Sequence, residues 1–220
     1  FKETIRKKSD VEYKYKKQSG GHGQYGHVKM TFEPSGDMDT PYVFEQTVVG
    51  GAVPKNFFPA VEKGIAESVK KGPLAAYPVT GIKAVLYDGS YHPVDSSEMA
   101  FKVATQQAFK KGIMEAKPVL LEPIATLKVV VPEGYTGDVM GELNKRRARV
   151  MGMNPTDNGY QEIVADIPYL ELYGYNATLR SMTSGSGTFS YEFARYEQAP
   201  DDVAAKQIEE RASKLVEVEE

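Results

Sequence analysis

The 220-residue sequence predicts an α+β protein of two domains. Stretches in which apolar and polar residues alternate, as in half-buried strands, are interspersed with stretches of helical spacing. From residue 122 the predicted order is strand, helix, strand, strand, helix, strand, the ferredoxin-like arrangement of an antiparallel sheet with both helices on one face. We therefore predict domains over residues 1–121 and 122–197, followed by a C-terminal helix and an acidic tail over residues 198–220.

The first domain is predicted to begin with a hairpin. Residues 11–18 and 28–32 both alternate apolar and polar side chains, which indicates two strands. Residues 19–26 between them contain four glycines, so the connection is a long, glycine-rich loop. A polar turn then leads to a third strand over residues 42–49.

Two helices and a fourth strand complete the first domain. Apolar residues spaced three and four apart predict a helix over residues 55–71, and Gly72-Pro73 ends it. A strand over residues 79–87 is followed by a predicted turn at Asp88-Gly89-Ser90. The pair Asp95 and Glu98 predicts a capping box for a helix over residues 96–111.

The second domain is predicted from six segments in order. They are a strand at 124–131, a helix from Thr136, strands at 149–154 and 160–167, a helix at 169–179 and a strand at 188–196. Residues 200–216 form a last helix, with Val203, Ile208 and Leu215 as its expected contacts.

Composition excludes several classes of protein. The chain has no cysteine, which excludes disulfides, thiol catalysis and cysteine zinc sites, and only three histidines, too few for most histidine metal sites. No apolar run approaches the roughly 18 residues of a membrane span. The absence of cysteine also fits a reducing cytoplasm, and we expect a cytoplasmic protein. Because the chain starts at Phe1 and not at methionine, we expect it to be a piece of a larger protein.

Two glycine-rich segments raise the possibility of a nucleotide or nucleophile site. The loop from Gly20 to Gly26 lacks the Gly-Lys-Ser/Thr ending of a phosphate-binding loop and joins two strands, so we expect no GTP or ATP site in this chain. Gly185-Ser186-Gly187 precedes a strand and not a helix, which argues against a nucleophile elbow. A stand-alone enzyme or small-molecule binder is the alternative that we weigh against a binding module.

Two other features suit RNA contact, although each has an ordinary explanation. Tyr91 could stack on a base and His92 could hydrogen-bond to one, but a loop histidine is usually only solvated. Basic side chains gather near the end of a predicted helix, where they complement the helix dipole or bind phosphate: Lys145, Arg146, Arg147 and Arg149.

Eight motifs in order resemble elongation factor G. The loop and strand of residues 18–28 resemble the opening of that family's fourth domain, and residues 49–55, 86–92 and 94–101 follow in its order. Leu121-Glu122-Pro123, Gly137-Asp138-Val139, Asn144–Arg147 and Thr183-Ser184-Gly185 continue the match into its fifth domain. The resemblance spans about residues 1–197.

The resemblance implies a left-handed βαβ fold for the first domain and a ribosomal role for both. In the family the fourth-domain tip enters the decoding-centre A site and contacts the tRNA–mRNA duplex during translocation, and the fifth domain faces the large subunit near the stalk base. The tip residues that match are Ser19, Gly20, Gly21, His22, Gly23, Gln24, Tyr25, Gly89, Ser90, Tyr91, His92 and Pro93. Those carried over for large-subunit rRNA are Lys145, Arg146, Arg147, Arg149, Ser184, Gly185, Ser186 and Gly187.

The resemblance also implies what this chain is expected to lack. GTP and Mg²⁺ would bind an N-terminal domain of the parent GTPase, and we expect no cofactor, no catalytic residue and no metal here. The expected partners are the ribosome's rRNA, the A-site tRNA–mRNA and stalk-base proteins, with no membrane and a monomeric fragment.

Some positions depart from the family pattern. His22 and Ser186 stand where the family often has arginine, and Ala148 where it often has glycine. Without arginine, each of the first two positions lacks a permanent cation and a side chain that binds phosphate in a bidentate manner. These departures keep open a paralogue that acts in ribosome recycling or in stress-specific elongation.

Charge is unevenly distributed along the chain. The formal net charge is −3, but the segment from Glu197 onward contains eight acidic and three basic side chains. Residues 1–196 therefore carry a net charge of +2. Residues 1–29 alone hold eight basic and three acidic side chains. The acidic average therefore does not argue against an RNA partner for the body of the chain.

Overall fold

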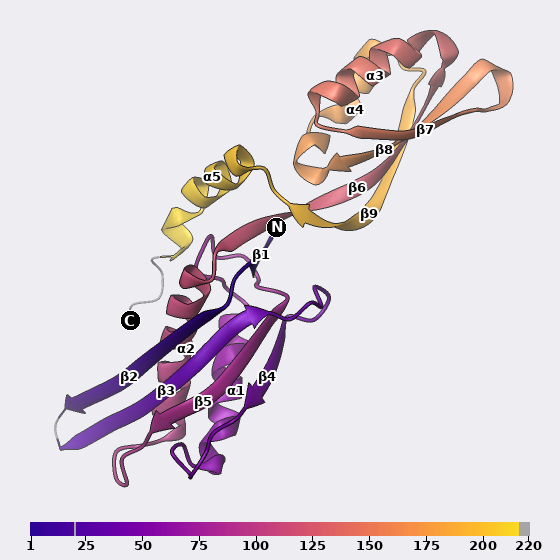
Figure 1. Ribbon diagram of the computed structural model, residues 1–220. Helices are drawn as coiled ribbons and strands as arrows, with labels where there is room; N and C mark the ends of the chain where they lie inside the picture. Colours follow the sequence, from indigo (N-terminus) through magenta and orange to yellow (C-terminus); the bar gives the residue numbers. More distant parts are fainter. Residues whose placement is uncertain (20, 216–220) are drawn as a thin grey trace. The chain divides into compact units, whose positions relative to one another are not determined.

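A computed structural model describes residues 1–19 and 21–215, which form two compact units (Figure 1). The first unit contains residues 1–120 together with the segment from Ala199, and the second contains Leu121–Gln198. The segment after Gln198, which the sequence assigns to neither domain, therefore packs on the first unit. Gly20 and the predicted acidic tail over 217–220 lie outside the described residues.

The first unit is built on a four-stranded sheet in the order β2-β3-β5-β4. Its strands are β2 (Ser9–Ser19), β3 (His22–Pro34), β5 (Ile82–Ser90) and β4 (Tyr42–Gln46). Neighbouring strands are antiparallel except β4 and β5, which are parallel and are joined through α1. Helices α1 (Phe58–Ser68) and α2 (Glu98–Glu115) lie together on one face of this sheet (Figure 1), and a 3₁₀ turn over Lys55–Phe57 leads into α1.

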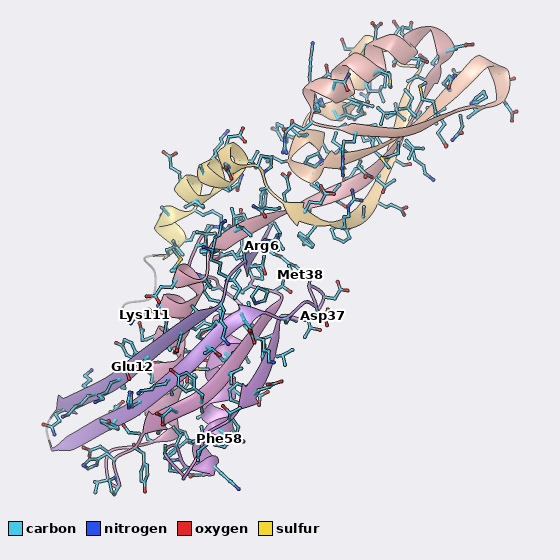
Figure 2. All side chains as sticks on the ribbon, viewed as in Figure 1. Arg6, Glu12, Asp37, Met38, Phe58 and Lys111 are labelled. Atoms are coloured by element: carbon cyan, nitrogen blue, oxygen red, sulfur yellow. The ribbon has the colours of Figure 1, made fainter. Side chains whose placement is uncertain are left out.

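Alternation along β3 explains which face of the sheet is covered. Val28, Met30 and Phe32 are fully buried against the helices, and the ring of Phe32 meets Phe109 of α2 edge-on at 5.8 Å. The intervening side chains of β3 belong to the opposite, open face, which also carries Glu12 of β2 (Figure 2).

Two segments from the ends of the chain, β1 (Lys2–Ile5) and the segment after Gln198, also belong to the first unit. Strand β1 pairs with β6 (Pro118–Pro132), which begins in this unit. Helix α5 (Asp201–Glu210) and the 3₁₀ turn Ala212–Leu215 follow the second unit in sequence, and Val203 and Ile208 of α5 pack on Ala75 and Leu120, while Arg211 binds the carbonyls of residues 75 and 76.

The second unit is the predicted ferredoxin-like arrangement. Its strands lie in the order β9-β6-β8-β7 and are antiparallel. They are β6 (Pro118–Pro132), β7 (Arg149–Pro155), β8 (Tyr160–Pro168) and β9 (Thr188–Gln198), with helices α3 (Thr136–Lys145) and α4 (Tyr175–Met182) and 3₁₀ turns at Glu133–Tyr135, Asp157–Gly159 and Tyr169–Leu172. Both helices cover one face (Figure 1).

Three local predictions are wrong. Residues 88–90 are the end of β5 and not a turn, because Gly89 has no side chain to collide with the carbonyl of His27 across the ladder. The cap of α2 is Ser97, whose hydroxyl accepts the amide of Ala100, and not Asp95. The helix predicted over 169–179 is broken at Gly174, whose φ of 73° is left-handed.

Within the described residues, no helix combines the length and apolar character needed to cross a membrane.

Candidate nucleic-acid interface

One end of the first unit, here called the tip, combines the β2–β3 connection with the loop of residues 91–97. The ladder of the hairpin runs as far as the pair Ser19 and His22, and Gly21 has a φ of 90° that suits only glycine. Gly23 pairs with Gln18, and Gln24 with Lys17. The structure therefore gathers the predicted tip segments at one end of the sheet, apart from Gly20, which is not described.

Backbone contacts join the two parts of the tip. The amide of Tyr25 donates to the carbonyl of Asp95 at 3.0 Å, and the hydroxyl of Ser96 donates to the carbonyl of Tyr25 at 2.8 Å. A methyl group on Gly23 would lie 2.4 Å from a carboxylate oxygen of Asp95, so glycine allows the hairpin to approach the loop. The loop is consequently fixed to the hairpin, a connection that no spacing in the sequence indicates.

Behind the tip, a hydrogen-bonded row crosses three strands. Tyr25 Oη lies 2.6 Å from Ser90 Oγ, which lies 2.7 Å from His27 Nδ1, and His27 Nε2 lies 2.9 Å from a carboxylate oxygen of Glu12. The hydrogen bond from His27 lowers the pKa of Glu12, with a smaller contribution from Lys29. Sequence reasoning missed His27 and Glu12, which lie on separate strands 15 residues apart.

This row has the connectivity of a serine–histidine–carboxylate triad, which raises the question of catalysis. The hydroxyl of Ser90, however, is held by Tyr25 on one side and by the buried ring of His27 on the other. Because the Ser90 hydroxyl is hydrogen-bonded to two side chains of the protein, we do not assign it the role of a nucleophile. We interpret the row as support for Tyr25.

Exposed aromatic rings mark the outer surface of the tip. Tyr91 is 48% exposed, and the side chain of His92 is also 48% exposed. The ring of Tyr25 lies 6.4 Å from that of His92, and Pro93 is exposed beside it. These rings are available for stacking and hydrogen bonding, the two contacts that proteins use most often on single-stranded or splayed RNA.

Cations lie along the strand that leads to the tip. Lys14, Lys16 and Lys17 of β2 are exposed. Lys29 of the neighbouring strand is instead engaged by carboxylates, 3.9 Å from Glu12 and 3.8 Å from Asp88. The β2 lysines are therefore the cations of the tip best placed for phosphate.

In the second unit, Arg146 is occupied within the protein. Its guanidinium lies 5.2 Å from the ring centre of Tyr175. It also donates to four acceptors on α3 and in the segment through α4: the Glu142 carboxylate at 2.9 Å, the carbonyls of Glu171 at 2.6 Å and Tyr173 at 3.0 Å, and the Thr178 hydroxyl at 3.2 Å. Arg146 therefore fastens α3 to the segment that contains α4.

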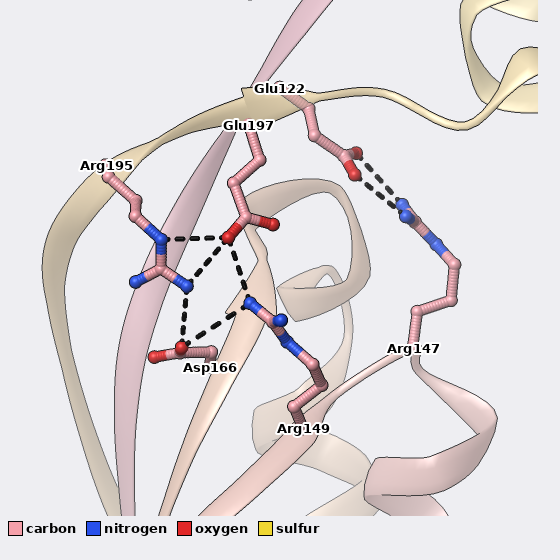
Figure 3. Close-up of polar contacts among 6 residues, drawn as sticks. All are labelled: Glu122, Arg147, Arg149, Asp166, Arg195 and Glu197. Carbon is pink, nitrogen blue, oxygen red and sulfur yellow. Dashed lines mark hydrogen bonds and ion pairs between the residues drawn. The ribbon is translucent and has the colours of Figure 1, made fainter.

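Arg147 is likewise bound internally, in a backbone conformation that is rare for arginine. Its guanidinium makes a bidentate pair with Glu122, at 2.9 and 3.1 Å (Figure 3). It donates a third bond to Glu171 at 3.1 Å. The Glu122 side chain is only 4% exposed. Its hydrogen bonds to the Arg147 guanidinium raise the pKa of Arg147 above the ordinary value for arginine. The φ of Arg147 is 56°, a position after a helix where glycine is usual.

Arg149 belongs to a second ion-pair cluster on the same sheet (Figure 3). With Arg195 it shares Glu197, at 2.9 and 2.8 Å, and Asp166, at 3.8 and 2.7 Å. Lys145 is exposed, and no ion pair joins it to another described residue. Of the four basic residues predicted for RNA contact, Lys145 is thus the least engaged by the protein itself.

The loop after α4 is closed by its own hydrogen bonds. Ser184 and Gly185 have φ values of 50° and 83°, and the amide of Gly185 donates to the carbonyl of Arg180 at 2.9 Å. The hydroxyl of Thr183 accepts the amide of Gly187 at 2.9 Å, and Ser186 Oγ donates back to the carbonyl of Thr183. The predicted loop of residues 184–187 is therefore a compact turn.

Comparing two replacements of Arg147, by alanine and by glycine, distinguishes the contribution of its side chain from the strain of its backbone. We expect Arg147→Ala to destabilise the second unit by about 3 kcal/mol, because it leaves the buried carboxylate of Glu122 without its cation. Arg147→Gly loses the same ion pairs but relieves the left-handed strain, so its loss should be smaller by about 1 kcal/mol. Urea unfolding of both variants measures the difference. A glycine variant no more stable than the alanine variant would show that the backbone conformation is unstrained.

Two family models together cover most of the chain. Residues 1–117 match the family model for elongation factor G, domain IV, and residues 119–207 match the model for the elongation factor G C-terminus. A relative from Thermotoga maritima called elongation factor G-like protein is 49% identical over 219 residues, which are 100% of this chain and 32% of the relative. A crystal structure of a protein from Thermus thermophilus superposes with a TM-score of 0.81 at 44% identity, over 96% of this chain and 31% of that protein.

The chain thus spans about a third of the length of the proteins that it matches. The matched family models meet at residues 117 and 119, next to the boundary between the structural units at residues 120 and 121. These matches show that the chain belongs to the elongation factor G family and contains its fourth domain and its C-terminal domain.

Proposed function

We propose that this chain is the ribosome-binding C-terminal part of an elongation factor G-like GTPase that acts in the cytoplasm and promotes tRNA–mRNA translocation. The tip would enter the decoding-centre A site, and GTP and Mg²⁺ would bind an N-terminal domain of the parent protein. Family membership supports the general role. The observation that carries the finer role is the tip itself, where exposed Tyr91 and His92 are held on a loop that the hairpin braces.

The tip suits a steric and binding task. The hairpin and the loop of residues 91–97 are hydrogen-bonded to each other through Tyr25, so the loop can contact a ligand without being displaced. The exposed lysines of β2 supply sequence-independent attraction to phosphate, and the exposed rings supply contacts to bases. In this mechanism the chain performs no covalent chemistry: occupation of the A site prevents the tRNAs from slipping back.

For the second unit we propose a contact with large-subunit rRNA and stalk-base proteins through Lys145 and the turn of residues 184–187. Arg146 and Arg147 would support this surface from within, since their guanidiniums are bound to protein acceptors. Arg149 is 63% exposed and could exchange its carboxylate partners for phosphate.

Replacing His92 with alanine in the full-length factor tests the proposed function. We expect translocation to slow by about tenfold, the equivalent of one lost hydrogen bond in the transition state, while GTP hydrolysis on the ribosome stays within about twofold. Stopped-flow measurements of both rates on one ribosome preparation provide the comparison. Equal loss of both rates, or loss of neither, would contradict a role for the tip in translocation.

A paralogue that acts in ribosome recycling or stress-specific elongation is the second candidate. It is favoured by His22 and Ser186, which stand where the family often has arginine, and by a relative that is named as elongation factor G-like. Translocation and subunit-splitting assays run side by side on the full-length factor distinguish the two. Splitting without translocation would favour the paralogue.

A further inference from the structure

The imidazole of His92 is held by the backbone of its own loop. Its Nδ1 atom lies 3.1 Å from the amide nitrogen of Val94 and 3.0 Å from that of Asp95, and both amides donate to it. A ring nitrogen that accepts a hydrogen bond carries no proton, so in this arrangement the proton of the neutral ring resides on Nε2. The tautomer is thus assigned from its hydrogen-bond partners.

Ser96 fixes the position of this loop and therefore of the ring. Its hydroxyl accepts the amide of His92 at 2.9 Å and donates to the carbonyl of Tyr25 at 2.8 Å, and its own amide donates to the carbonyl of His92 at 3.1 Å. One side chain thereby ties the backbone that carries the histidine to strand β3. Neither end of the loop can shift without breaking these bonds.

Nδ1 is the ring nitrogen of His92 that the protein engages. The carboxylate of Asp95 lies 3.7 Å from Nδ1, on the side already occupied by the two amides. The ring of Tyr25 lies 6.4 Å away, and about half of the His92 side chain is exposed. No hydrogen bond from Nε2 to another described residue is present.

We infer that His92 binds RNA as a neutral Nε2–H donor aimed at a hydrogen-bond acceptor, and that Ser96 is the positioning residue that presents it. The inference rests on the proposed function and specifies its chemistry. The acceptor would be a phosphate oxygen, a ribose hydroxyl or a base carbonyl, and the exposed lysines of β2 would attract the phosphates of the same RNA. The contribution of His92 is then geometric and not one of charge.

The tautomer can be tested without a ribosome. Nitrogen-15 NMR of the 220-residue chain at about pH 8 distinguishes Nε2–H from Nδ1–H rings, and His92→Gln identifies the signal among the three histidines. We expect a single Nε2–H pattern for His92, and in Ser96→Ala a shift toward averaged tautomers. Ser97→Ala, which removes only the cap of α2, serves as the control and should leave that pattern unchanged. An Nδ1–H or averaged pattern in the unaltered chain would overturn the assignment.

The donor role is tested by two amides of different reach in the full-length factor. The side-chain nitrogen of glutamine reaches about as far as Nε2, whereas that of asparagine reaches only about as far as Nδ1. We expect His92→Gln to translocate within about threefold of the unaltered factor and His92→Asn to be slower by about tenfold, the size of one neutral hydrogen bond. This deficit should be the same at low and high salt, because a neutral contact displaces no counterions.

The contrary outcomes are distinct. If the deficit of His92→Asn shrank as salt rose, His92 would act as a cation and the inference would be wrong. Equal rates for the glutamine and asparagine variants would also refute a donor at Nε2. Normal translocation by all variants, including His92→Ala, would refute the proposed function itself, whereas the NMR result on the tautomer would stand independently.

Discussion

Replacing Glu3 with alanine is expected to destabilise the first unit by about 4 kcal/mol, the largest effect that we predict for a single side chain. Glu3 is fully buried, and its carboxylate accepts the amides of Leu74 at 2.8 Å, Ala75 at 3.0 Å and Tyr77 at 2.8 Å. Alanine would leave these three amides without an acceptor, and each unpaired buried donor costs about 1–3 kcal/mol. Thermal and urea unfolding of the 220-residue chain measure the loss.

Glu3→Gln refines this prediction, because it removes the charge and keeps one oxygen. Burial raises the pKa of Glu3 above 4.5, and the hydrogen bonds from Leu74, Tyr77 and Ala75 oppose that rise. A raised pKa in the folded state favours the protonated form, so this contribution to stability is full below pH 4.5 and is lost as the pH rises through the folded-state pKa.

The glutamine variant lacks this titration, so the stability of the unaltered chain relative to Glu3→Gln should fall as the pH rises through that window. Glutamine offers one oxygen to three donors, and we expect it to lose about 2 kcal/mol at neutral pH, less than alanine. A Glu3→Ala chain as stable as the unaltered one would contradict the role of Glu3 as the acceptor of this loop.

The second large effect is expected from Gly26→Ala, at about 3 kcal/mol. A methyl group at Gly26 would lie 2.5 Å from the carbonyl oxygen of Ala100, 2.7 Å from its carbonyl carbon and 2.9 Å from the amide nitrogen of Phe101. All three atoms belong to the backbone of α2, which cannot rotate aside as a flexible side chain can. The helix must therefore move away from β3, and the packing between them is lost.

A matched control is Gly141→Ala in α3. A methyl group there meets no atom within 4 Å, and its φ is not left-handed. Because alanine favours the helix more than glycine, this variant should be about 0.5–1 kcal/mol more stable. Calorimetry measures the unfolding temperatures of both variants. If Gly26→Ala unfolded at the same temperature as the unaltered chain, the steric argument would be wrong.

The fold of both domains was predictable because the spacing of apolar residues along the chain reflects which side chains are buried. The alternation of Val28, Met30 and Phe32 indicates a strand with one covered face, and these residues form part of the core. The order of elements in the second domain was likewise sufficient for the ferredoxin-like arrangement, which the sheet order confirms. Local hydrophobic spacing therefore determined the architecture.

Local spacing was a poor guide where a distant partner decides the outcome. Strand β1 contains Lys2 and Glu3, which do not suggest a buried strand, yet Glu3 is buried because three amides some 70 residues away bind its carboxylate. Asp88–Ser90 reads as a turn, but pairing with His27, Val28 and Lys29 holds it in β5. In both cases long-range hydrogen bonds override the local preference.

The candidate site divides in the same way. The motifs of the sequence identified the tip segments and the basic cluster, whereas their roles depended on contacts between elements. Arg146 and Arg147 look like a phosphate patch in the sequence, but their guanidiniums bind acceptors within the second unit. A carboxylate at a distant position in the sequence cannot be recognised as a partner from charge pattern alone.

The sequence by itself determined the family, the two-domain α+β fold and the segments that form the tip, because these depend on ordered motifs and on local periodicity. Only the tertiary structure decided that Ser96 and Tyr25 tie the loop to the hairpin and that Nδ1 of His92 accepts the amides of Val94 and Asp95. The physical reason is that a hydrogen bond is directional and short-ranged. Its partners are fixed by how the chain folds back on itself, and their separation in the sequence does not reveal them.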